Sequence, residues 1–175
     1  MLVRRELPGD EASIRAVTAA AFARPGEDVP VEAPLVDWLR ASAAWIPELS
    51  LVAVDPDGGP GDEIAGHVVC TRGTVGAAPV LALGPLSVRP GRQRSGVGQA
   101  LVHAVLGAAD ALGEPLVALL GSTAYYPRFG FRRSFEYGIT PQRPEWAEHF
   151  QVRTLTAYDP AVRGEFAYPE PFDRM

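Results

Sequence analysis

Two spacings of apolar residues alternate along the chain. Short apolar or alternating runs bounded by Gly, Pro and Asp are typical of β-strands, whereas apolar residues three and four positions apart are typical of amphipathic helices. The first pattern predicts strands over residues 2–7, 49–54, 64–71, 80–88, 116–120, 129–135 and 151–158. The second predicts helices over residues 11–22, 32–44 and 97–112, and a short helix within 121–128. The order β-α-α-β-β-β-α-β-α-β-β is that of a mixed α/β sheet.

Turn-forming residues separate these elements and indicate how they pair. Pro8-Gly9-Asp10 is a turn in which Asp10 is placed to cap the first helix. The run DPDGGPGD at 55–62 predicts a hairpin between the strands on either side of it. The strand–loop–helix–strand unit at 80–120 predicts a parallel pair with a right-handed crossover. We expect the proline-containing tail, 159–175, to lie on the surface.

Composition limits the class of protein. A chain of 175 residues forms a single domain and can bury a core without disulfides. The formal net charge of −5 argues against non-specific binding to nucleic acid. All 16 basic residues are Arg, and the chain contains neither Lys nor Asn.

Cys70 is the only cysteine, so an internal disulfide and a cysteine metal cluster are both excluded, and we expect a buried, inert thiol. The first residues, MLVRRELPGD, lack the apolar stretch of a signal peptide. No apolar run has the length of a membrane span. We therefore expect a cytoplasmic protein with no metal, no nucleic-acid partner and no membrane partner.

A loop dense in Gly and Arg lies between the predicted strand 80–88 and the predicted helix 97–112. Its sequence over 89–98 is RPGRQRSGVG. The first N–H groups of a helix have no intrahelical acceptor, and the helix dipole favours negative charge there. Glycines let the backbone come close to such an anion. This arrangement predicts a phosphate-bearing ligand at 92–98.

Three phosphate-binding motifs are dense in glycine. A P-loop requires Gly-Lys followed by Ser or Thr, and this chain has no Lys. The dinucleotide motif G-x-G-x-x-G fits Gly96 and Gly98, but its third glycine position is Leu101, and more strands precede the motif than in that fold. The third motif, Gln/Arg-x-x-Gly-x-Gly/Ala, matches Gln93-Arg94-Ser95-Gly96-Val97-Gly98 in every slot.

On this third motif the sequence resembles the GCN5-related N-acetyltransferase (GNAT) superfamily, in which the loop binds the pyrophosphate of acetyl-CoA. The segment LGPLSVRP at 83–90 is similar to the splayed fourth strand of that family. The segment AYYPRFGF at 124–131 is similar to its short helix and sixth strand. The run 63–131, together with the segment from Tyr168 to Phe172, is most similar to the YhbS-type branch of predicted N-acetyltransferases.

The resemblance implies an α/β (α+β) fold. The sheet would be mixed and mostly antiparallel, with about six or seven strands, splayed parallel strands 4 and 5, and helices on both faces. One N-acetyltransferase domain would span 1–175, with 1–80 on the substrate side, 81–135 as the acetyl-CoA-binding core, and 136–175 as the last strand and tail. The implied reaction is transfer of the acetyl group of acetyl-CoA to a primary amine of a small molecule or protein, by direct attack in a ternary complex.

The resemblance also implies the site residues. The acetyl-CoA-binding set comprises backbone groups facing the pantetheine and acetyl carbonyl and the loop that binds the pyrophosphate: Leu86, Ser87, Val88, Gln93, Arg94, Ser95, Gly96, Val97, Gly98 and Gln99. Tyr126, four residues before Gly130, corresponds to the tyrosine that protonates the leaving thiolate. A phenol with a pKa of about 10 suits that task. Gly84-Pro85 supports a splayed strand, because Pro removes a ladder donor and Gly marks a bulge.

The general base, the acceptor and one contact stay open. Glu63 and His67 at the third predicted strand are candidate bases, although a core histidine is at least as plausible at His67. Ser122 stands where many family members carry Asn and the YhbS-type branch carries Asp. The alternative function is a non-catalytic acetyl-CoA-binding or regulatory module, since one acid–base group is evident. Segments 22–44 and 137–150 would select the acceptor, and the last strand would allow a homodimer.

Overall fold

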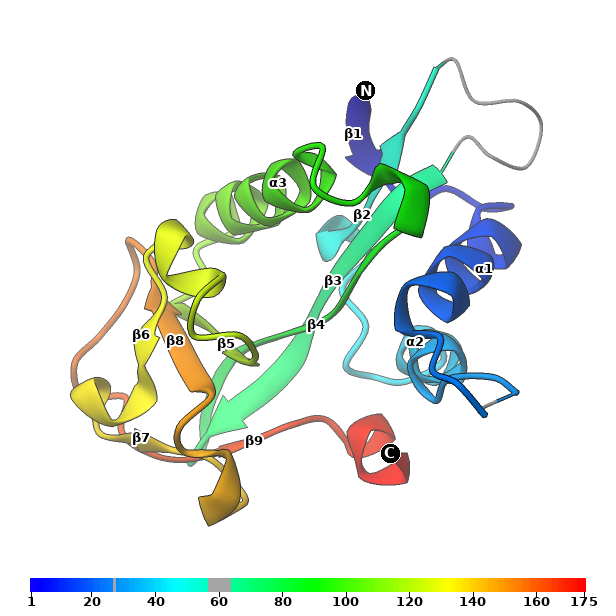
Figure 1. Ribbon diagram of the computed structural model, residues 1–175. Helices are drawn as coiled ribbons and strands as arrows, with labels where there is room; N and C mark the ends of the chain where they lie inside the picture. Colours follow the sequence, from blue (N-terminus) through cyan, green and yellow to red (C-terminus); the bar gives the residue numbers. More distant parts are fainter. Residues whose placement is uncertain (27, 57–63) are drawn as a thin grey trace.

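The computed structural model describes residues 1–26, 28–56 and 64–175. Its centre is a sheet in the order β1-β2-β3-β4-β5-β8-β6, to which β9 attaches through β3, and β7 through β9 (Figure 1). The strands are β1 (Leu2–Arg5), β2 (Ser50–Val54), β3 (Ile64–Val75), β4 (Ala78–Val88), β5 (Leu116–Leu120), β6 (Arg132–Arg133), β7 (Ile139–Thr140), β8 (Phe150–Thr154) and β9 (Gly164–Ala167). Along the main order every pair is antiparallel except β4 with β5. The predicted mixed, mostly antiparallel sheet is confirmed.

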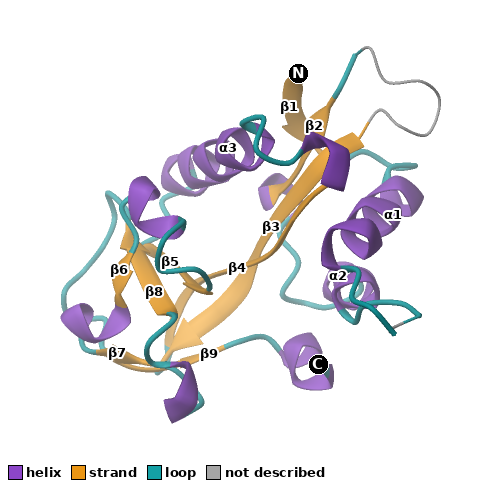
Figure 2. Ribbon diagram, viewed as in Figure 1, coloured by secondary structure: helices purple, strands orange, loops and turns teal. Residues whose placement is uncertain are grey.

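Helices cover both faces of this sheet. The α-helices are α1 (Glu11–Phe22), α2 (Glu32–Arg40) and α3 (Val97–Ala111). Figures 1 and 2 show α3 on one side of the long strands β3 and β4, and α1 and α2 on the other. Short 3-10 helices complete the fold: η1 (Pro47–Leu49), η2 (Pro90–Arg92), η3 (Tyr126–Phe129), η4 (Ser134–Tyr137), η5 (Pro144–Trp146) and η6 (Glu170–Arg174).

The core follows from the apolar spacing of the helices. Leu101, Val105 and Ala109 of α3 are fully buried in a cluster that includes residues of β3, β4 and β5. On the other face, Ile14 and Val17 of α1 pack in a second buried cluster with residues of α2, β2 and β3. Burial of each large aliphatic side chain contributes about 1.5–3 kcal/mol, so these two stripes hold the helices against the sheet.

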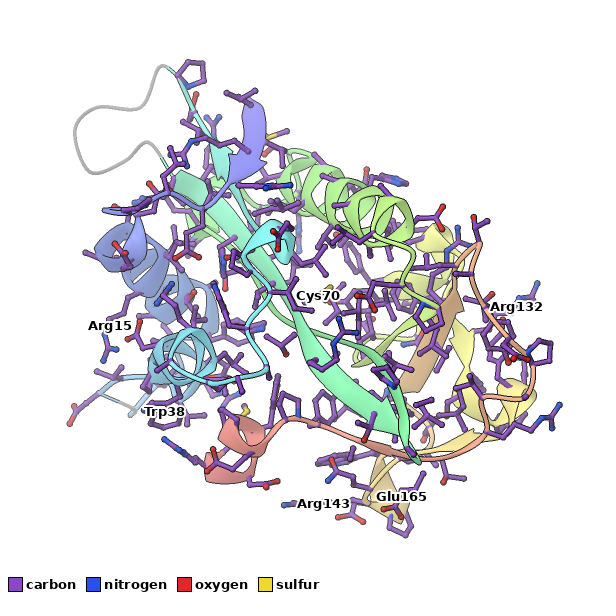
Figure 3. All side chains as sticks on the ribbon, turned by 180° about the vertical axis from the view of Figure 1, so that it is seen from behind. Arg15, Trp38, Cys70, Arg132, Arg143 and Glu165 are labelled. Carbon is purple, nitrogen blue, oxygen red and sulfur yellow. The ribbon has the colours of Figure 1, made fainter. Side chains whose placement is uncertain are left out.

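Cys70 belongs to the first of these clusters. Figure 3 shows it in the interior on β3, whereas Arg15 and Arg132 extend from the outside of the molecule. Burial raises the pKa of the Cys70 thiol, so the reactive thiolate is not formed near neutral pH. The prediction of a buried, inert thiol is confirmed.

The strands β4 and β5 separate soon after they pair. In the described chain, β4 pairs with β5 at Leu81 and Ala82 and nowhere beyond. The β3–β4 register shifts between Val68 and Cys70 of β3, where β4 has one extra residue. The extra residue falls at Gly84-Pro85, so the bulge and the splay predicted from this dipeptide are both found.

The C-terminal tail forms structure that the sequence did not indicate. Strand β9 pairs with β3, with Ala167 opposite Thr74 and Phe166 opposite Val75. This pairing accompanies the extension of β3 to Val75, beyond the predicted end at residue 71. The tail is therefore part of the sheet, because its partner strand comes from a distant part of the chain.

Other predicted boundaries also move. The helix α2 ends at Arg40, not at residue 44, and β6 is reduced to two residues because η4 begins at Ser134. Strand β8 ends at Thr154, after which the N–H of Thr156 donates to the Asp110 carboxylate at 2.8 Å. The antiparallel β2–β3 hairpin is confirmed, but 57–62 of its predicted turn lie outside the described residues.

Asp10 does not cap α1, and this prediction was wrong. Its carboxylate accepts hydrogen bonds from the Arg4 guanidinium at 2.6 and 3.1 Å and from the Leu7 N–H at 2.8 Å. The Arg4 contacts keep the pKa of Asp10 below its ordinary value. A charged partner is a stronger competitor for the carboxylate than a helix N–H group.

Candidate active site

The loop between β4 and α3 presents backbone N–H groups. Gly96 immediately precedes α3 with a φ of 90°, in the left-handed region that favours glycine, and Arg94 has a φ of 59°. The N–H of Ala100 donates to the Gly96 carbonyl at 3.0 Å and begins the helix ladder. Among the described residues, the N–H groups of 94–99 have no backbone acceptor. They form a row of free donors at the positive end of the α3 dipole.

Side chains of the loop brace this shape. The Gln93 amide donates from Nε2 to the Val88 carbonyl at 3.2 Å, and the Ser95 hydroxyl donates to the Arg92 carbonyl at 2.6 Å. The Val97 side chain is buried in the core cluster beneath α3 and anchors the end of the loop there. The loop therefore presents mainly backbone groups, which is the kind of donor set that suits an anion at a helix N-terminus.

The loop arginines do not all face the same way. Arg92 forms an ion pair with Asp55 at 2.6 Å, and Arg89 donates from Nη2 to the Ile64 carbonyl at 3.1 Å. Both side chains therefore hold the loop against the ends of β2 and β3. Arg94 instead lines a cavity beside the loop.

Two cavities open where β4 leaves β5. We call the first the loop cavity; its volume is about 650 Å³, and it is lined by Ala21, Phe22, Leu86, Val88, Gln93, Arg94, Gly96, Gly98, Gln99, Tyr125 and Arg128. We call the second the aromatic cavity; its volume is about 350 Å³, and its lining includes Phe22, Leu86, Tyr126, Trp146, Tyr168 and Phe172. Phe22 and Leu86 belong to both linings, so the two cavities are adjacent at the splayed part of β4.

The predicted residues of β4 divide between two directions. The N–H of Arg89 donates to a β3 carbonyl at 2.9 Å, which sets the alternation of the ladder. By that alternation the backbone groups of Ser87 face β3, and those of Leu86 and Val88 face away from it. The Ser87 side chain is 0% exposed and donates to a threonine hydroxyl of α1 at 3.1 Å. Leu86 and Val88 thus reach the cavities, whereas Ser87 ties the sheet to α1.

Tyr126 lies at the start of η3, and its ring lines the aromatic cavity. The ring packs edge-on against Tyr125 and Phe131, with centroid distances of 5.1 and 5.7 Å. Burial raises the pKa of Tyr126 to about 12, so the hydroxyl keeps its proton near neutral pH. The neighbouring Tyr125 lines the loop cavity instead.

The turn after β5 makes room for Tyr126. A Cβ atom on Gly121 would lie 2.4 Å from Cε2 of the Tyr126 ring, so a side chain at Gly121 would displace the ring. The exposed Ser122 lines neither cavity, and its carbonyl accepts the N–H groups of Tyr125 and Tyr126 at 3.1 and 3.2 Å. Ser122 therefore shapes the turn that presents both tyrosines.

His67 lies outside both cavities. Its side chain is 0% exposed, and Nε2 is 2.9 Å from the Ser50 hydroxyl, which in turn donates to Glu6. This leaves the proton on Nε2 of His67, and Nδ1 has no partner among the described residues. Burial lowers the pKa of His67 to about 3. The structure favours the core alternative for His67, while Glu63 lies outside the described residues.

Two residues of the aromatic cavity escaped the sequence analysis as site residues. Glu32 opens α2 and lies in the segment 22–44 predicted to select the acceptor, but the acidic residues of that segment suit a solvated face as well as a cationic amine. Tyr168 belongs to the aromatic pair quoted with Phe172, but nothing in the tail indicated that it returns to the site. Burial raises the pKa of Tyr168, and this effect is larger than the lowering of the pKa by a hydrogen bond from the Leu120 backbone.

Two further features are absent from residues 1–26, 28–56 and 64–175. No group of three or more His, Cys, Asp or Glu side chains is arranged to hold a metal ion. None of the helices is both long and apolar enough to cross a membrane.

Comparison with known proteins identifies the family. The sequence model of the acetyltransferase (GNAT) family matches residues 18–131, which is more than half of the chain. The chain belongs to the GNAT family of acetyltransferases. The match includes β4, the loop, α3 and Tyr126, so the family predicted from the loop motif is confirmed.

Relatives of this GNAT chain match it over its whole length. It is 30% identical to the uncharacterized N-acetyltransferase YhbS of Escherichia coli K12, with 100% of both chains covered. A crystal structure of E. coli YhbS in complex with CoA has a TM-score of 0.87 and 29% identity, covering 99% of this chain and 92% of that one. A GNAT acetyltransferase from Brucella melitensis in complex with acetyl-CoA has a TM-score of 0.78 and 34% identity, covering 98% and 97%. These likenesses confirm the predicted GNAT fold.

Proposed function

We propose that this GNAT chain binds acetyl-CoA and transfers its acetyl group to a primary amine by direct attack in a ternary complex. The observation that supports this most directly is the meeting of the two cavities at Leu86. One cavity carries the free N–H groups of the loop, and the other carries Tyr126. Two related acetyltransferases bind CoA and acetyl-CoA, which favours the same co-substrate here.

The donor set of the loop cavity fits a pyrophosphate. The N–H groups of 94–99 lie at a helix N-terminus and lack backbone acceptors in the described chain. Arg94 and Arg128 line the same cavity, and the Arg128 guanidinium lies 4.8 Å from the centre of the Tyr125 ring. We assign the pyrophosphate to these groups, and the pantetheine arm to the outward backbone groups of Leu86 and Val88.

The reaction requires polarisation of the thioester carbonyl and stabilisation of the leaving sulfur. Bound acetyl-CoA would supply a thioester whose C–S bond breaks as the amine nitrogen bonds to the acetyl carbon. A protonated amine loses two protons overall, one to the sulfur and one to solvent. The N–H of Leu86 faces the junction of the cavities and can donate to the carbonyl oxygen.

Tyr126 is the donor proposed for the sulfur. Because its pKa is about 12, the phenol stays protonated near neutral pH and donates a hydrogen bond as negative charge develops on the leaving group. Its ring is held by Tyr125 and Phe131, which restricts the hydroxyl to the aromatic cavity. Positioning of this kind is effective because the donor needs no rearrangement during the reaction.

The test compares Tyr126→Phe with wild type. Release of free CoA is measured with acetyl-CoA and a panel of primary amines, and acetyl-CoA affinity is measured by calorimetry. We expect kcat to fall by roughly 10²–10³-fold, with the affinity for acetyl-CoA nearly unchanged. Tyr158→Phe is the matched control, because Tyr158 pairs with Tyr137 and lines neither cavity.

Two results would overturn the proposal. If the wild-type chain did not bind acetyl-CoA, acetyl-CoA could not be its co-substrate. Binding without CoA release for any amine, and without an effect of Tyr126→Phe, would support a non-catalytic acetyl-CoA-binding module instead.

A further inference from the structure

We infer that Glu32 binds the amino group of the acceptor in the aromatic cavity, and that the acceptor is a small primary amine carried on an apolar body. This inference rests on the proposed acetyl transfer and names its acceptor class. It starts from a buried carboxylate oxygen that has no hydrogen-bond donor in the described chain.

Glu32 is 7% exposed and lines the aromatic cavity. Its Oε1 atom accepts a hydrogen bond from Nη2 of Arg24 at 3.2 Å. Its Oε2 atom is buried and has no partner among the described residues. An unsatisfied buried acceptor is costly, and the cost is greater for a charged group. A ligand with N–H donors would remove that cost.

The helix itself does not use this oxygen. In the first turn of α2, the N–H groups of Ala33 and Leu35 donate to the carbonyls of Pro30 and Val31 at 3.1 and 3.0 Å. No side chain caps the N-terminus of α2. Oε2 of Glu32 is therefore available to accept a hydrogen bond from a ligand in the aromatic cavity.

The walls of the aromatic cavity indicate what accompanies the amino group. Phe22 comes from the end of α1, Trp146 from η5, and Phe172 from η6. Aromatic rings around a carboxylate suit an alkylammonium, because the rings attract the cation and also bury its hydrocarbon part. A volume of about 350 Å³ suits a small molecule.

Charged residues of the rim do not replace Glu32. Arg143 and Asp173 line the aromatic cavity but are exposed. Figure 3 shows Arg143 at the edge of the molecule, and its guanidinium lies 5.0 Å from the Trp146 ring centre. Their opposite charges give the mouth little preference of its own. The group left to bind an amino group is therefore the Glu32 carboxylate, which Arg24 contacts only through Oε1.

Glu32 shares the aromatic cavity with Leu86 and Tyr126. An amino group held by its carboxylate therefore lies in the same space as the groups proposed for acetyl transfer. A carboxylate oxygen accepts hydrogen bonds from an ammonium and from the neutral amine alike, so Glu32 keeps orienting the nitrogen after its proton leaves. Glu32 is a specificity-determining residue in this scheme.

The test measures binding without turnover. The full chain, saturated with CoA in place of acetyl-CoA, is titrated by calorimetry with 2-phenylethylamine and with 2-phenylethanol. The two probes share an apolar body and differ in the charged amino group. Wild type should bind the amine at least about 10-fold more tightly than the alcohol, and Glu32→Gln should reduce that ratio to below about 3-fold.

Three further variants separate recognition from folding. Glu145→Gln removes a nearby exposed carboxylate outside the cavity lining and should leave the ratio within about 2-fold of wild type. Arg24→Gln removes the partner of Oε1 and should also keep the preference for the amine. Glu32→Asp retains the charge at a shorter reach and should give an intermediate ratio, with unchanged affinity for acetyl-CoA.

The outcomes are distinguishable from those of the proposed function. If Glu32→Gln keeps the wild-type ratio while acetyl-CoA still binds and transfer to other amines continues, the inference is wrong and the acetyl transfer stands. Equal losses in Arg24→Gln and Glu32→Gln would assign Glu32 to a structural ion pair and overturn the inference. Failure of wild type to bind 2-phenylethylamine would overturn the acceptor class.

Discussion

The loop cavity and the aromatic cavity meet at Leu86, yet they are built by different means. Most of the loop cavity comes from a short continuous segment, 86–99, and its donors are largely backbone N–H groups. The aromatic cavity takes its lining from α1, α2, β4 and β5, η3, η5 and the C-terminal tail, and it presents mainly side chains.

This difference matches the two partners proposed for the site. A pyrophosphate is the same in every acetyl-CoA molecule, and backbone donors bind it whatever the surrounding side chains are. An acceptor has to be distinguished from other amines, and side chains such as Glu32 and Trp146 supply that discrimination. Substitutions in the loop cavity should therefore affect all acceptors alike, whereas those in the aromatic cavity should affect acceptors unequally.

The largest effect is expected at Gly96. Gly96→Asp places a carboxylate beside the free N–H groups of the loop, and we expect acetyl-CoA affinity to fall by about 100-fold or more through repulsion of the phosphates. Gly96→Asn is the matched control, because Asn tolerates a left-handed backbone and has nearly the same shape without the charge. Its loss should be below about 10-fold by calorimetry. Equal losses would show that shape, and not the anion, governs this position.

Gly121→Ala should have the next largest effect. The added Cβ would overlap the Tyr126 ring, so kcat should fall by roughly 10–100-fold for every acceptor while acetyl-CoA affinity stays within about 3-fold. Gly107→Ala in α3 is the control: its Cβ would meet nothing within 4 Å, and it should raise stability by about 0.5–1 kcal/mol. If kcat were unchanged in Gly121→Ala, the position of the Tyr126 ring would not matter for the reaction, and the role proposed for Tyr126 would be wrong.

Trp146→Ala should lower kcat/KM for apolar acceptors more than for polar ones. Loss of this wall should lower kcat/KM for 2-phenylethylamine by about 10-fold, because apolar contact area is lost, and should change that for ethanolamine by less than about 2-fold. Steady-state assays with both amines at saturating acetyl-CoA measure the effect. A uniform loss for both amines would contradict the assignment of acceptor selection to this cavity.

The smallest effect on catalysis is expected at His67. Because the pKa of His67 is depressed in the folded chain, the unfolded chain binds a proton at this residue more readily than the folded chain between about pH 3 and pH 6.5. The contribution of neutral His67 to the free energy of unfolding is therefore complete above pH 6.5 and is lost as the pH falls. Between about pH 7 and pH 5 this amounts to about 2 kcal/mol of unfolding free energy. His67→Gln should flatten that dependence in urea unfolding without changing the pH profile of kcat. The control His149→Gln, at an exposed position, should change neither the pH dependence of stability nor the pH profile of kcat. If His67→Gln shifted the pH profile of kcat, His67 would again be a candidate base.

Local patterns predicted the part of this protein that is local in the fold. The apolar spacing predicted α1, α3 and the central strands, and Gly84-Pro85 predicted the bulge and splay of β4. The loop motif predicted the family, because its spacing reflects the geometry of backbone donors at a helix N-terminus. These features depend on neighbours in the chain, so sequence patterns are enough to recognise them.

Tertiary packing determined the remainder. Strand β9 pairs with the extended end of β3, and the Asp10 carboxylate binds Arg4 instead of capping the helix. His67 is enclosed between β2 and β4 and contacts Ser50. The aromatic cavity is the clearest case, since Glu32 of α2 and Tyr168 of the tail line the same cavity as Tyr126 only when both segments pack beside the splayed strands. Burial also sets the properties of these groups: the pKa of Tyr126 and the unpaired oxygen of Glu32 depend on surroundings that the chain acquires on folding.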